Sequence, residues 1–181
     1  MTTYVALLRA INVSGNNAIR MAELQRICAE LGLEDVRSYL QSGNLVFRTS
    51  RSNAAKLAGA INADIAQHFG FDVAVLVLPA EELNTVADSN PLWPQHGGEE
   101  RMFHATFLFQ PVLKRSFEAL KLPLAPGESA VLAGQVVLLH CPHGYGRTKL
   151  NNGYFEKVLG VAATTRNWRT VLALQQLCNA P

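Results

Sequence analysis

The chain has 181 residues, of which 49% are hydrophobic and 17% are charged, and its formal net charge is +2. This length supports one sizeable hydrophobic core or two small ones in a globular protein. No segment approaches the roughly 20 uninterrupted apolar residues of a membrane-spanning helix, and the N-terminus lacks the basic head of a signal peptide. We therefore expect a cytoplasmic protein with no membrane partner.

The first half of the chain alternates strand-like and helix-like patterns of apolar residues. We predict a strand at 4–9, a helix at 21–31, a hairpin of strands 36–41 and 44–49 around Ser42 and Gly43, a helix at 54–69 and a strand at 72–79. This order, βαββαβ, is that of a ferredoxin-like domain.

The second half repeats much of this order. We predict a strand at 105–111, a helix at 112–122, strands at 128–132 and 135–140 around Ala133 and Gly134, and a helix at 150–159. The sixth element is predicted as a helix over 167–177, capped by Thr164 or Thr165, in place of a last strand. The fold class is therefore α+β, with two ferredoxin-like halves of which the second carries a C-terminal helix instead of its last strand.

The domain boundaries follow from composition. Residues 88–100 are acidic and contain proline and glycine, which favours a joint between two domains. We predict a first domain at 1–88, a joint at 89–100 and a second domain at 101–181. Strand 72–79 is apolar on both alternating faces, so we expect both faces of its sheet to be covered, which disfavours an open RNA-reading sheet.

The small net charge hides an uneven distribution. Residues 61–100 contain seven Asp or Glu and no Lys or Arg, whereas residues 141–181 contain five Lys or Arg and one Glu. Residues 1–60 are also basic, with seven Lys or Arg and four Asp or Glu. Two basic ends could share an anion-binding cleft, although solvated surface charge is an alternative of similar weight.

The segment 7–21 places Arg9 at the end of a strand, followed by a loop rich in Asn and Gly and then by a helix. A strand, a loop and a helix start in this order present backbone N–H groups to an anion. The alternative is a polar loop in which Asn12, Asn16 and Asn17 bond to their own backbone.

The segment 144–170 has cations at two predicted helix starts. Arg147 and Lys149 precede one helix, and Arg166 and Arg169 surround the start of the next. Because the N-terminal end of a helix dipole is already positive, these cations need an anion or an acidic side chain nearby. The alternative is structural, with Arg147 or Arg166 paired to Glu156 or to the acidic middle segment.

Other candidates for chemistry are weak. Cys28, Cys141 and Cys178 are an odd number without a CxxC pair, which favours reduced thiols. His140 and Cys141 lie on opposite faces of a strand with no second ligand pair, so no metal site is predicted. A Cys141–His143 nucleophile stays open beside the commoner buried thiol, and His104 fits a structural histidine.

Four motifs together give a resemblance to a known family. They are VALLRAINVSG, YLQSGNLVF, GYGRTKL and TTRNWRTV, and with them the chain resembles, nearly end to end, a bacterial family designated domain of unknown function 1697. The resemblance implies two ferredoxin-like domains in a cytoplasmic protein, and it supplies no activity, cofactor or catalytic residue. The chain departs from the family pattern at Ala10 and Ser14, where glycine is usual, and at Thr148, where serine is common.

The basic ends suggest one functional hypothesis. We predict that the protein binds a small phosphate- or carboxylate-bearing molecule, such as a nucleotide, in a cleft between its N- and C-terminal motifs. The predicted ligand-binding residues are Arg9, Asn12, Arg147, Lys149, Arg166 and Asn167. A nucleic-acid-binding module is the first alternative, and an interaction protein such as a homodimer is the second. The patterns identify no cofactor and do not decide whether the protein is an enzyme.

Overall fold

The computed structural model describes residues 1–93 and 98–180, so residues 94–97 of the predicted joint lie outside the described ranges. The chain divides into two compact units. The first unit contains Met1–Thr85 together with Ala173–Pro181, and the second contains Val86–Leu172. Both divisions fall inside helices, namely α3 (Ala80–Asp88) and α7 (Trp168–Asn179).

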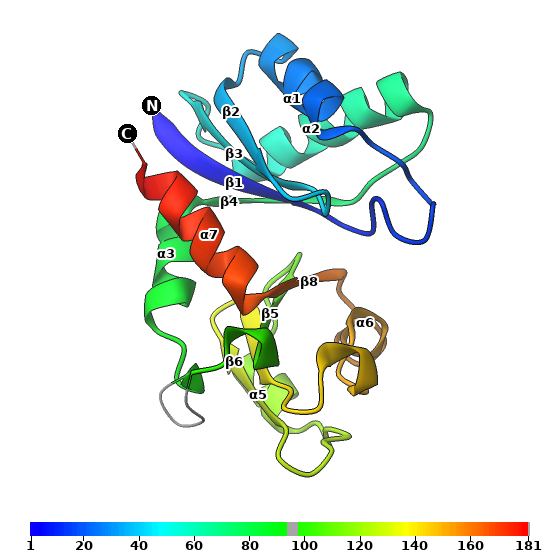
Figure 1. Ribbon diagram of the computed structural model, residues 1–181, viewed down its shortest axis with the longest axis vertical. Coiled ribbons are helices and arrows are strands. Elements are labelled where there is room, and N and C mark those ends of the chain that lie inside the picture. The colour runs from blue at the N-terminus through cyan, green and yellow to red at the C-terminus, as the bar shows by residue number, and fades with distance from the viewer. Residues whose placement is uncertain (94–97, 181) are drawn as a thin grey trace. The chain divides into compact units, whose positions relative to one another are not determined.

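The first unit has a four-stranded antiparallel sheet with the strand order β2-β3-β1-β4. In chain order its elements are β1 (Thr2–Leu8), α1 (Met21–Glu30), β2 (Glu34–Tyr39), β3 (Asn44–Thr49), α2 (Ala54–Phe69) and β4 (Val75–Pro79). Helices α1 and α2 cover one face of this sheet (Figure 1). The six elements of this unit follow the order βαββαβ, which is the predicted order.

The local sequence explains where the helices of this unit begin and end. Asn53 caps α2, because its Oδ1 accepts a hydrogen bond of 2.9 Å from the backbone N–H of Lys56. Gly70 ends the same helix in the left-handed region, at φ 81°. Leu24, Ile27 and Cys28 of α1 recur at helical spacing and are all buried against the sheet.

Both faces of the first sheet are covered, as the apolar pattern predicted. In β1, Val5 and Leu7 point to one face and Ala6 and Leu8 to the other, and all four are completely buried. An open sheet that reads RNA with exposed central side chains is therefore not available in this unit.

The second unit has another four-stranded antiparallel sheet, with the order β6-β7-β5-β8. Its strands and main helices, in chain order, are β5 (Phe103–Leu108), α5 (Lys114–Glu118), β6 (Ser129–Ala133), β7 (Val136–His140), α6 (Asn152–Leu159) and β8 (Ala163–Asn167). The fold is thus a mixed α+β one with two four-stranded antiparallel sheets. Helix α5 is shorter than the predicted helix 112–122, since it begins at Lys114 and ends at Glu118.

The prediction that the second half lacks its last strand is wrong. Strand β8 pairs with β5 along its whole length, with Thr165 opposite Thr106 and Arg166 opposite Ala105. Strand β8 was not predicted because its sequence is polar, and Thr and Asn are also common helix-capping residues. The cap of α7 is neither Thr164 nor Thr165 but Asn167, whose Oδ1 accepts a hydrogen bond of 3.0 Å from the backbone N–H of Arg169.

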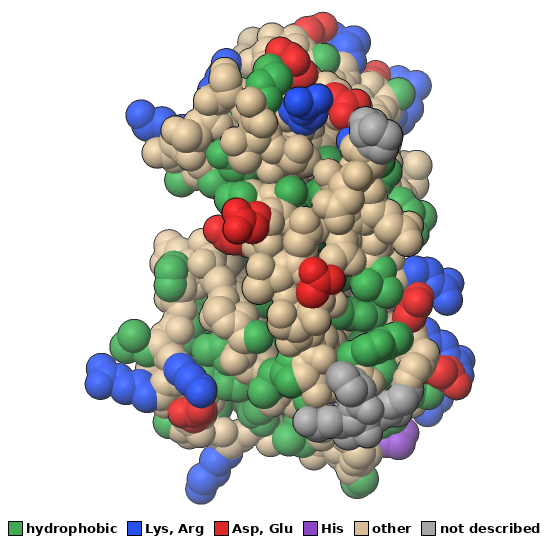
Figure 2. Space-filling view, turned by 90° about the vertical axis from the view of Figure 1, so that its left-hand side faces the viewer, with side chains coloured by type: hydrophobic (Ala, Val, Ile, Leu, Met, Phe, Trp, Pro, Cys, Tyr) green, Lys and Arg blue, Asp and Glu red, His purple; other side chains and the backbone are tan. Residues whose placement is uncertain are grey.

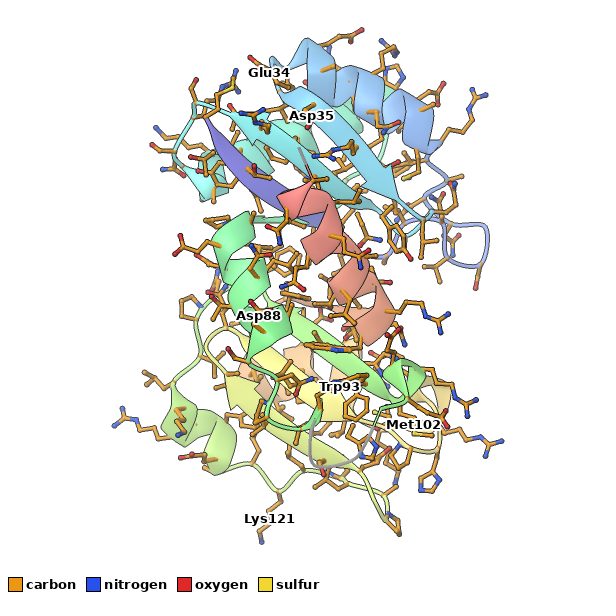
Figure 3. All side chains as sticks on the ribbon, turned by 60° about the vertical axis from the view of Figure 1, so that its left-hand side comes forward. Glu34, Asp35, Asp88, Trp93, Met102 and Lys121 are labelled. Carbon is orange, nitrogen blue, oxygen red and sulfur yellow. The ribbon has the colours of Figure 1, made fainter. Side chains whose placement is uncertain are left out.

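The β2–β3 connection is longer than the predicted Ser42-Gly43 turn. Strand β2 ends at Tyr39 and β3 begins at Asn44, which leaves a four-residue turn. Leu40 and Gly43 within it both have positive φ, at 58° and 76°. Asp35 also has a positive φ, 50°, and lies beside Glu34 at the start of β2, where the register with β3 shifts (Figure 3).

Candidate functional site

The predicted ligand-binding residues fall into two groups. Arg9 and Asn12 belong to the first unit, and Arg147, Lys149, Arg166 and Asn167 belong to the second. Their assembly into one cleft stays a prediction.

Asn12 holds the loop between β1 and α1 in place. Its Nδ2 donates hydrogen bonds to the carbonyl oxygens of Ile19, at 3.0 Å, and Gln41, at 2.6 Å. Its Oδ1 accepts a hydrogen bond of 2.8 Å from the backbone N–H of Ile19. Both amide hydrogen atoms are thus used inside the unit, so a ligand could reach only the remaining acceptor capacity of Oδ1.

Arg9 directly follows β1 and is half-buried. Its backbone N–H donates a hydrogen bond of 2.9 Å to the carbonyl of Ala74, which fixes the position of the main chain at this point. The loop that follows is held by its own side chains, since Asn17 Nδ2 donates to the carbonyl of Ala10 at 3.3 Å. The alternative for this segment was a polar loop whose Asn side chains bond to backbone atoms. Asn12 and Asn17 form such bonds.

A second set of cations in the first unit surrounds the start of α2. A hollow of about 280 Å³ there is lined by Arg51, Ser52, Asn53, Lys56 and Leu57. Arg51 is held in place because its Nη2 donates a hydrogen bond of 2.9 Å to the carbonyl of Leu31. The first turn of α2 contains no acidic residue, so the positive end of this helix dipole and two cations act together. The size of the hollow suits a small anion better than a drug-sized ligand.

In the second unit, Arg147 and Lys149 are exposed and precede α6. Arg147 ends a short 3₁₀ turn at Tyr145–Arg147, and the following residue, Thr148, accepts a hydrogen bond from the backbone N–H of Leu150 at 3.1 Å. Neither cation forms an ion pair with another residue of the described ranges. The first turn of α6 contains no acidic residue. Arg147 and Lys149 therefore place positive charge near the positive end of the helix dipole without an acidic side chain in that turn.

The two other predicted residues of the second unit are engaged in its interior. Arg166 is only 7% exposed, and its Nη1 donates to Thr164 Oγ1 at 2.8 Å and to the carbonyl of Thr165 at 3.0 Å. Burial lowers the pKa of Arg166 to about 10, so the guanidinium remains charged at neutral pH. Asn167 caps α7 through Oδ1, and its Nδ2 lies 3.3 Å from His104 Nε2.

Charge at the start of α7 is offset by an acidic side chain. Arg169 Nε lies 3.4 Å from Glu100 Oε2. Trp168, the first residue of α7, is buried and lies 6.4 Å from Trp93, measured between ring centroids. Trp93, labelled in Figure 3, packs edge-on against Phe103, the first residue of β5. Trp168 is therefore a core residue, and at 1% exposure its ring is not available to stack on a base.

His104 belongs to a buried polar cluster on β5 and β8. Its ring stacks on Tyr145, with the ring centroids 4.7 Å apart. Burial lowers the pKa of His104 to about 4, against the opposing effect of a backbone hydrogen bond at Met102. Thr106 and Thr165 continue the cluster, with their hydroxyl oxygens 2.8 Å apart. This histidine is neutral at pH 7 and fits the structural role predicted for it.

The segment HCPH offers no reactive thiol. Cys141 is completely buried, and burial raises its pKa to about 11, with a smaller contribution from Glu128. His143 Nε2 lies 2.8 Å from the carbonyl oxygen of Pro126. Within residues 1–93 and 98–180, no three His, Cys, Asp or Glu side chains are grouped so that they could hold a metal ion. Cys141 is therefore a buried, protonated thiol.

Comparison with known proteins assigns the chain to a family. The model of the family described as protein of unknown function DUF1697 matches residues 1–137. The chain belongs to the DUF1697 family. A solved structure of a conserved bacterial protein from Streptococcus pneumoniae is similar over 98% of this chain and 99% of that chain, with 27% identity and a TM-score of 0.70. No curated protein matches the chain significantly. In the described ranges, no helix has the length and apolar content that a membrane span requires.

Sequence reasoning missed the cations at the start of α2 in this DUF1697 protein. Arg51 and Lys56 flank the capping residue Asn53 of a helix whose bounds were predicted correctly. The same test that was applied to segments 7–21 and 144–170, cations at an acid-free helix start, would have found them. The hollow itself depends on side-chain packing and has no signature in the sequence.

The departures from the DUF1697 pattern predict a gain in stability. Ala10 and Ser14 have positive φ, 55° and 50°, at the two positions where the family usually has glycine. A side chain in this region is strained and glycine is not, so Ala10→Gly and Ser14→Gly should each stabilise the protein by about 0.5–1 kcal/mol. Thermal unfolding measures this, with Ala18→Gly as a control in the same loop. A lower melting temperature for both variants would contradict the expectation.

Proposed function

We propose that the protein binds a small phosphate- or carboxylate-bearing anion. The observation that carries the proposal is the hollow at the start of α2, whose lining includes Arg51 and Lys56 and no acidic side chain. A helix N-terminus with two cations attracts an anion through the dipole, the charges and the backbone N–H groups together. Small phosphorylated metabolites, or the phosphate group of a nucleotide whose remainder lies outside the hollow, are the ligands that this chemistry favours.

The sequence-predicted residues form a second candidate place for the same ligand class. Arg147 and Lys149 are exposed before α6, without an acidic side chain in its first turn. The predicted cleft still includes, as proposed members, Arg9, Asn12, Arg166 and Asn167, although internal hydrogen bonds already occupy Asn12 and Asn167.

We also propose that both units are ferredoxin-like, because of their element order, and that the protein is cytoplasmic.

Inorganic phosphate and a nucleoside monophosphate test the anion proposal through the melting temperature. A ligand that binds the native state raises it as ligand concentration rises. We expect this shift in the native protein and its loss in the double variant Arg51→Ala, Lys56→Ala. Removing the two cations relieves unfavourable charge at the helix start but also removes the hydrogen bond from Arg51 to Leu31, so that variant should melt close to the native temperature without ligand.

Two further double variants locate the site. Arg147→Ala with Lys149→Ala removes the charge before α6, and Arg115→Ala with Lys121→Ala removes the same charge from exposed positions elsewhere. The variant with Arg115→Ala and Lys121→Ala should show the same rise in melting temperature with phosphate as the native protein. If only the Arg147 and Lys149 pair loses the response, the anion lies before α6. No shift in the native protein would reject anion binding at both places.

The nucleic-acid alternative has less support. On the face drawn in Figure 2, Lys and Arg side chains are dispersed, and several lie beside Asp or Glu rather than forming one basic patch. Contacts to many phosphates would make binding weaken steeply as salt rises. Binding of a mixed-sequence oligonucleotide at low salt, with that salt dependence, would favour this alternative over a small anion.

A further inference from the structure

Each of the two sheets has two edge strands, namely β2 and β4 in the first unit and β6 and β8 in the second. An edge strand presents backbone N–H and C=O groups that no neighbouring strand of its own sheet uses, and these groups can pair with another extended chain. Proteins protect such edges with charged side chains, with proline or with an irregular register.

Three of the four edge strands have such protection. Strand β2 contains Glu34, Asp35 and Arg37, and its register with β3 shifts between Glu34 and Arg37. Strand β4 ends at Pro79, and β8 contains the charged Arg166. These three edges are therefore poorly suited to pair with another strand.

Strand β6 has none of these protections. Its sequence is SAVLA, and its register with β7 is regular from Ser129 to Ala133. The lack of charge extends beyond the strand, because residues 129–146 contain no Asp, Glu, Lys or Arg. An uncharged strand without proline is the kind that pairs readily with a further strand.

The hydrogen bonds of β7 show which backbone groups of β6 face outward. Leu108 N–H donates to the carbonyl of Gln135 at 3.0 Å, and Cys141 N–H donates to the carbonyl of Met102 at 2.7 Å. Odd-numbered residues of the segment 135–141 therefore bond to β5 and its ends. Since bonding alternates along an antiparallel strand, the even-numbered residues of this segment bond to β6.

Two residues of β6 lie opposite odd-numbered residues of β7. Ala130 pairs with Leu139, and Leu132 pairs with Val137. The backbone groups of Ala130 and Leu132 therefore point away from β7, toward the open edge. Within residues 1–93 and 98–180, no hydrogen bond reaches the outward N–H and C=O groups of these two residues.

This edge is complementary to itself. Ala130 and Leu132 lie symmetrically about Val131, the middle residue of β6. If a second copy of β6 runs antiparallel with the two Val131 residues opposite each other, Ala130 of each copy meets Leu132 of the other, and their outward N–H and C=O groups bond to one another. No like charges meet in this register. On the face where Ala130 and Leu132 pack on the core, a small side chain meets a large one.

We infer that two copies of the chain pair through β6, so that their second sheets join into one antiparallel sheet across a two-fold axis at Val131. A second copy satisfies the hydrogen bonds, the charge and the side-chain sizes of this edge together, as an isologous interface requires. The pairing gives the homodimer alternative a specific surface. It involves only the second unit, and it does not depend on the anion site proposed at the start of α2.

Sedimentation velocity tests the pairing and its register. The native protein should form a dimer that dissociates on dilution. Val131→Lys and Val131→Glu should each raise the dimer dissociation constant about tenfold, because like charges then face each other across the two-fold axis. An equimolar mixture of the two variants should recover the dimer, since lysine then faces glutamate. This recovery would also show that both variants are folded.

Two further variants serve as controls. Ala130→Pro removes an outward N–H that β7 does not use, so it should abolish the dimer and keep a melting temperature close to the native one. Ser38→Lys adds a charge to the edge strand β2 and should leave the dimer unchanged.

Three outcomes would overturn the proposal. One is a Val131→Lys variant that dimerises as the native protein does. Another is a mixture of the Val131→Lys and Val131→Glu variants that stays monomeric. The third is a native protein that is monomeric at its highest soluble concentration, which would reject a second copy and favour an extended segment of another protein at this edge.

Discussion

The Gly43→Ala variant is expected to lose about 3–5 kcal/mol of stability, the largest effect of any single substitution proposed for this protein. A Cβ atom at this position would lie 2.6 Å from Leu8 Cβ and 2.8 Å from Ile11 Cδ1. Leu8 Cβ is attached directly to the backbone of β1, so it cannot move without shifting the central strand. The positive φ of Gly43, 76°, adds the strain of a side chain in the left-handed region.

Gly70→Ala is the matched control for Gly43→Ala. Gly70 has a similar φ, 81°, and an added Cβ there meets no atom within 4 Å. It should therefore cost only the net backbone contribution, about 0.5–1 kcal/mol, which is the difference that Ala10→Gly should gain. Chemical denaturation of both variants separates the two contributions. Equal losses for Gly43→Ala and Gly70→Ala would mean that Leu8 and Ile11 move to make room for the extra atom.

Acidification should remove stability through His104, by about 2–3 kcal/mol. This side chain is 6% exposed, and burial lowers its folded-state pKa to about 4, below the value of about 6.5 in an unfolded chain. The stabilising contribution is thus fully present above pH 6.5. It is lost as the pH falls from 6.5 to 4, because the unfolded chain then binds a proton that the folded protein does not bind.

Urea denaturation at several pH values between 4 and 7.5 measures this contribution. The native protein should lose stability over that range more steeply than His104→Gln, whose side chain does not titrate. His143→Gln, at an exposed position, serves as the matched histidine-to-glutamine substitution. Parallel curves for the native protein and His104→Gln would show that His104 is protonated equally in the folded and unfolded states.

Most of the correct fold predictions came from the periodicity of apolar residues. The helix at 54–69 and the strand at 44–49 were predicted with their observed bounds, because both combine a clear apolar pattern with capping or turn residues. Strand β8 was missed, since its sequence ATTRN has no apolar alternation. What makes it a strand is pairing with β5 and the hydroxyl contact between Thr106 and Thr165, and both lie far away in sequence.

The candidate site was less predictable than the fold. Sequence reasoning located the cations before α6, because charge and helix starts are local properties. It could not foresee that Arg166 would be buried, since that depends on the face that β8 turns inward. The positive φ of Ala10 and Ser14 had an indirect sign, because glycine is usual in the family at both positions, whereas nothing in the sequence indicated the positive φ of Leu40.

The division of the chain inside α7 affects how the protein is made. The first unit includes Ala173–Pro181, and in this segment Asn179 accepts a hydrogen bond of 3.2 Å from Asn84 Nδ2. During synthesis, the N-terminal segment emerges first from the ribosome, but the residues from Ala173 onward emerge only after the whole of the second unit. The first unit of a nascent chain therefore waits for the second unit to be translated before it can be completed, and premature termination anywhere in the second unit leaves both units unfinished.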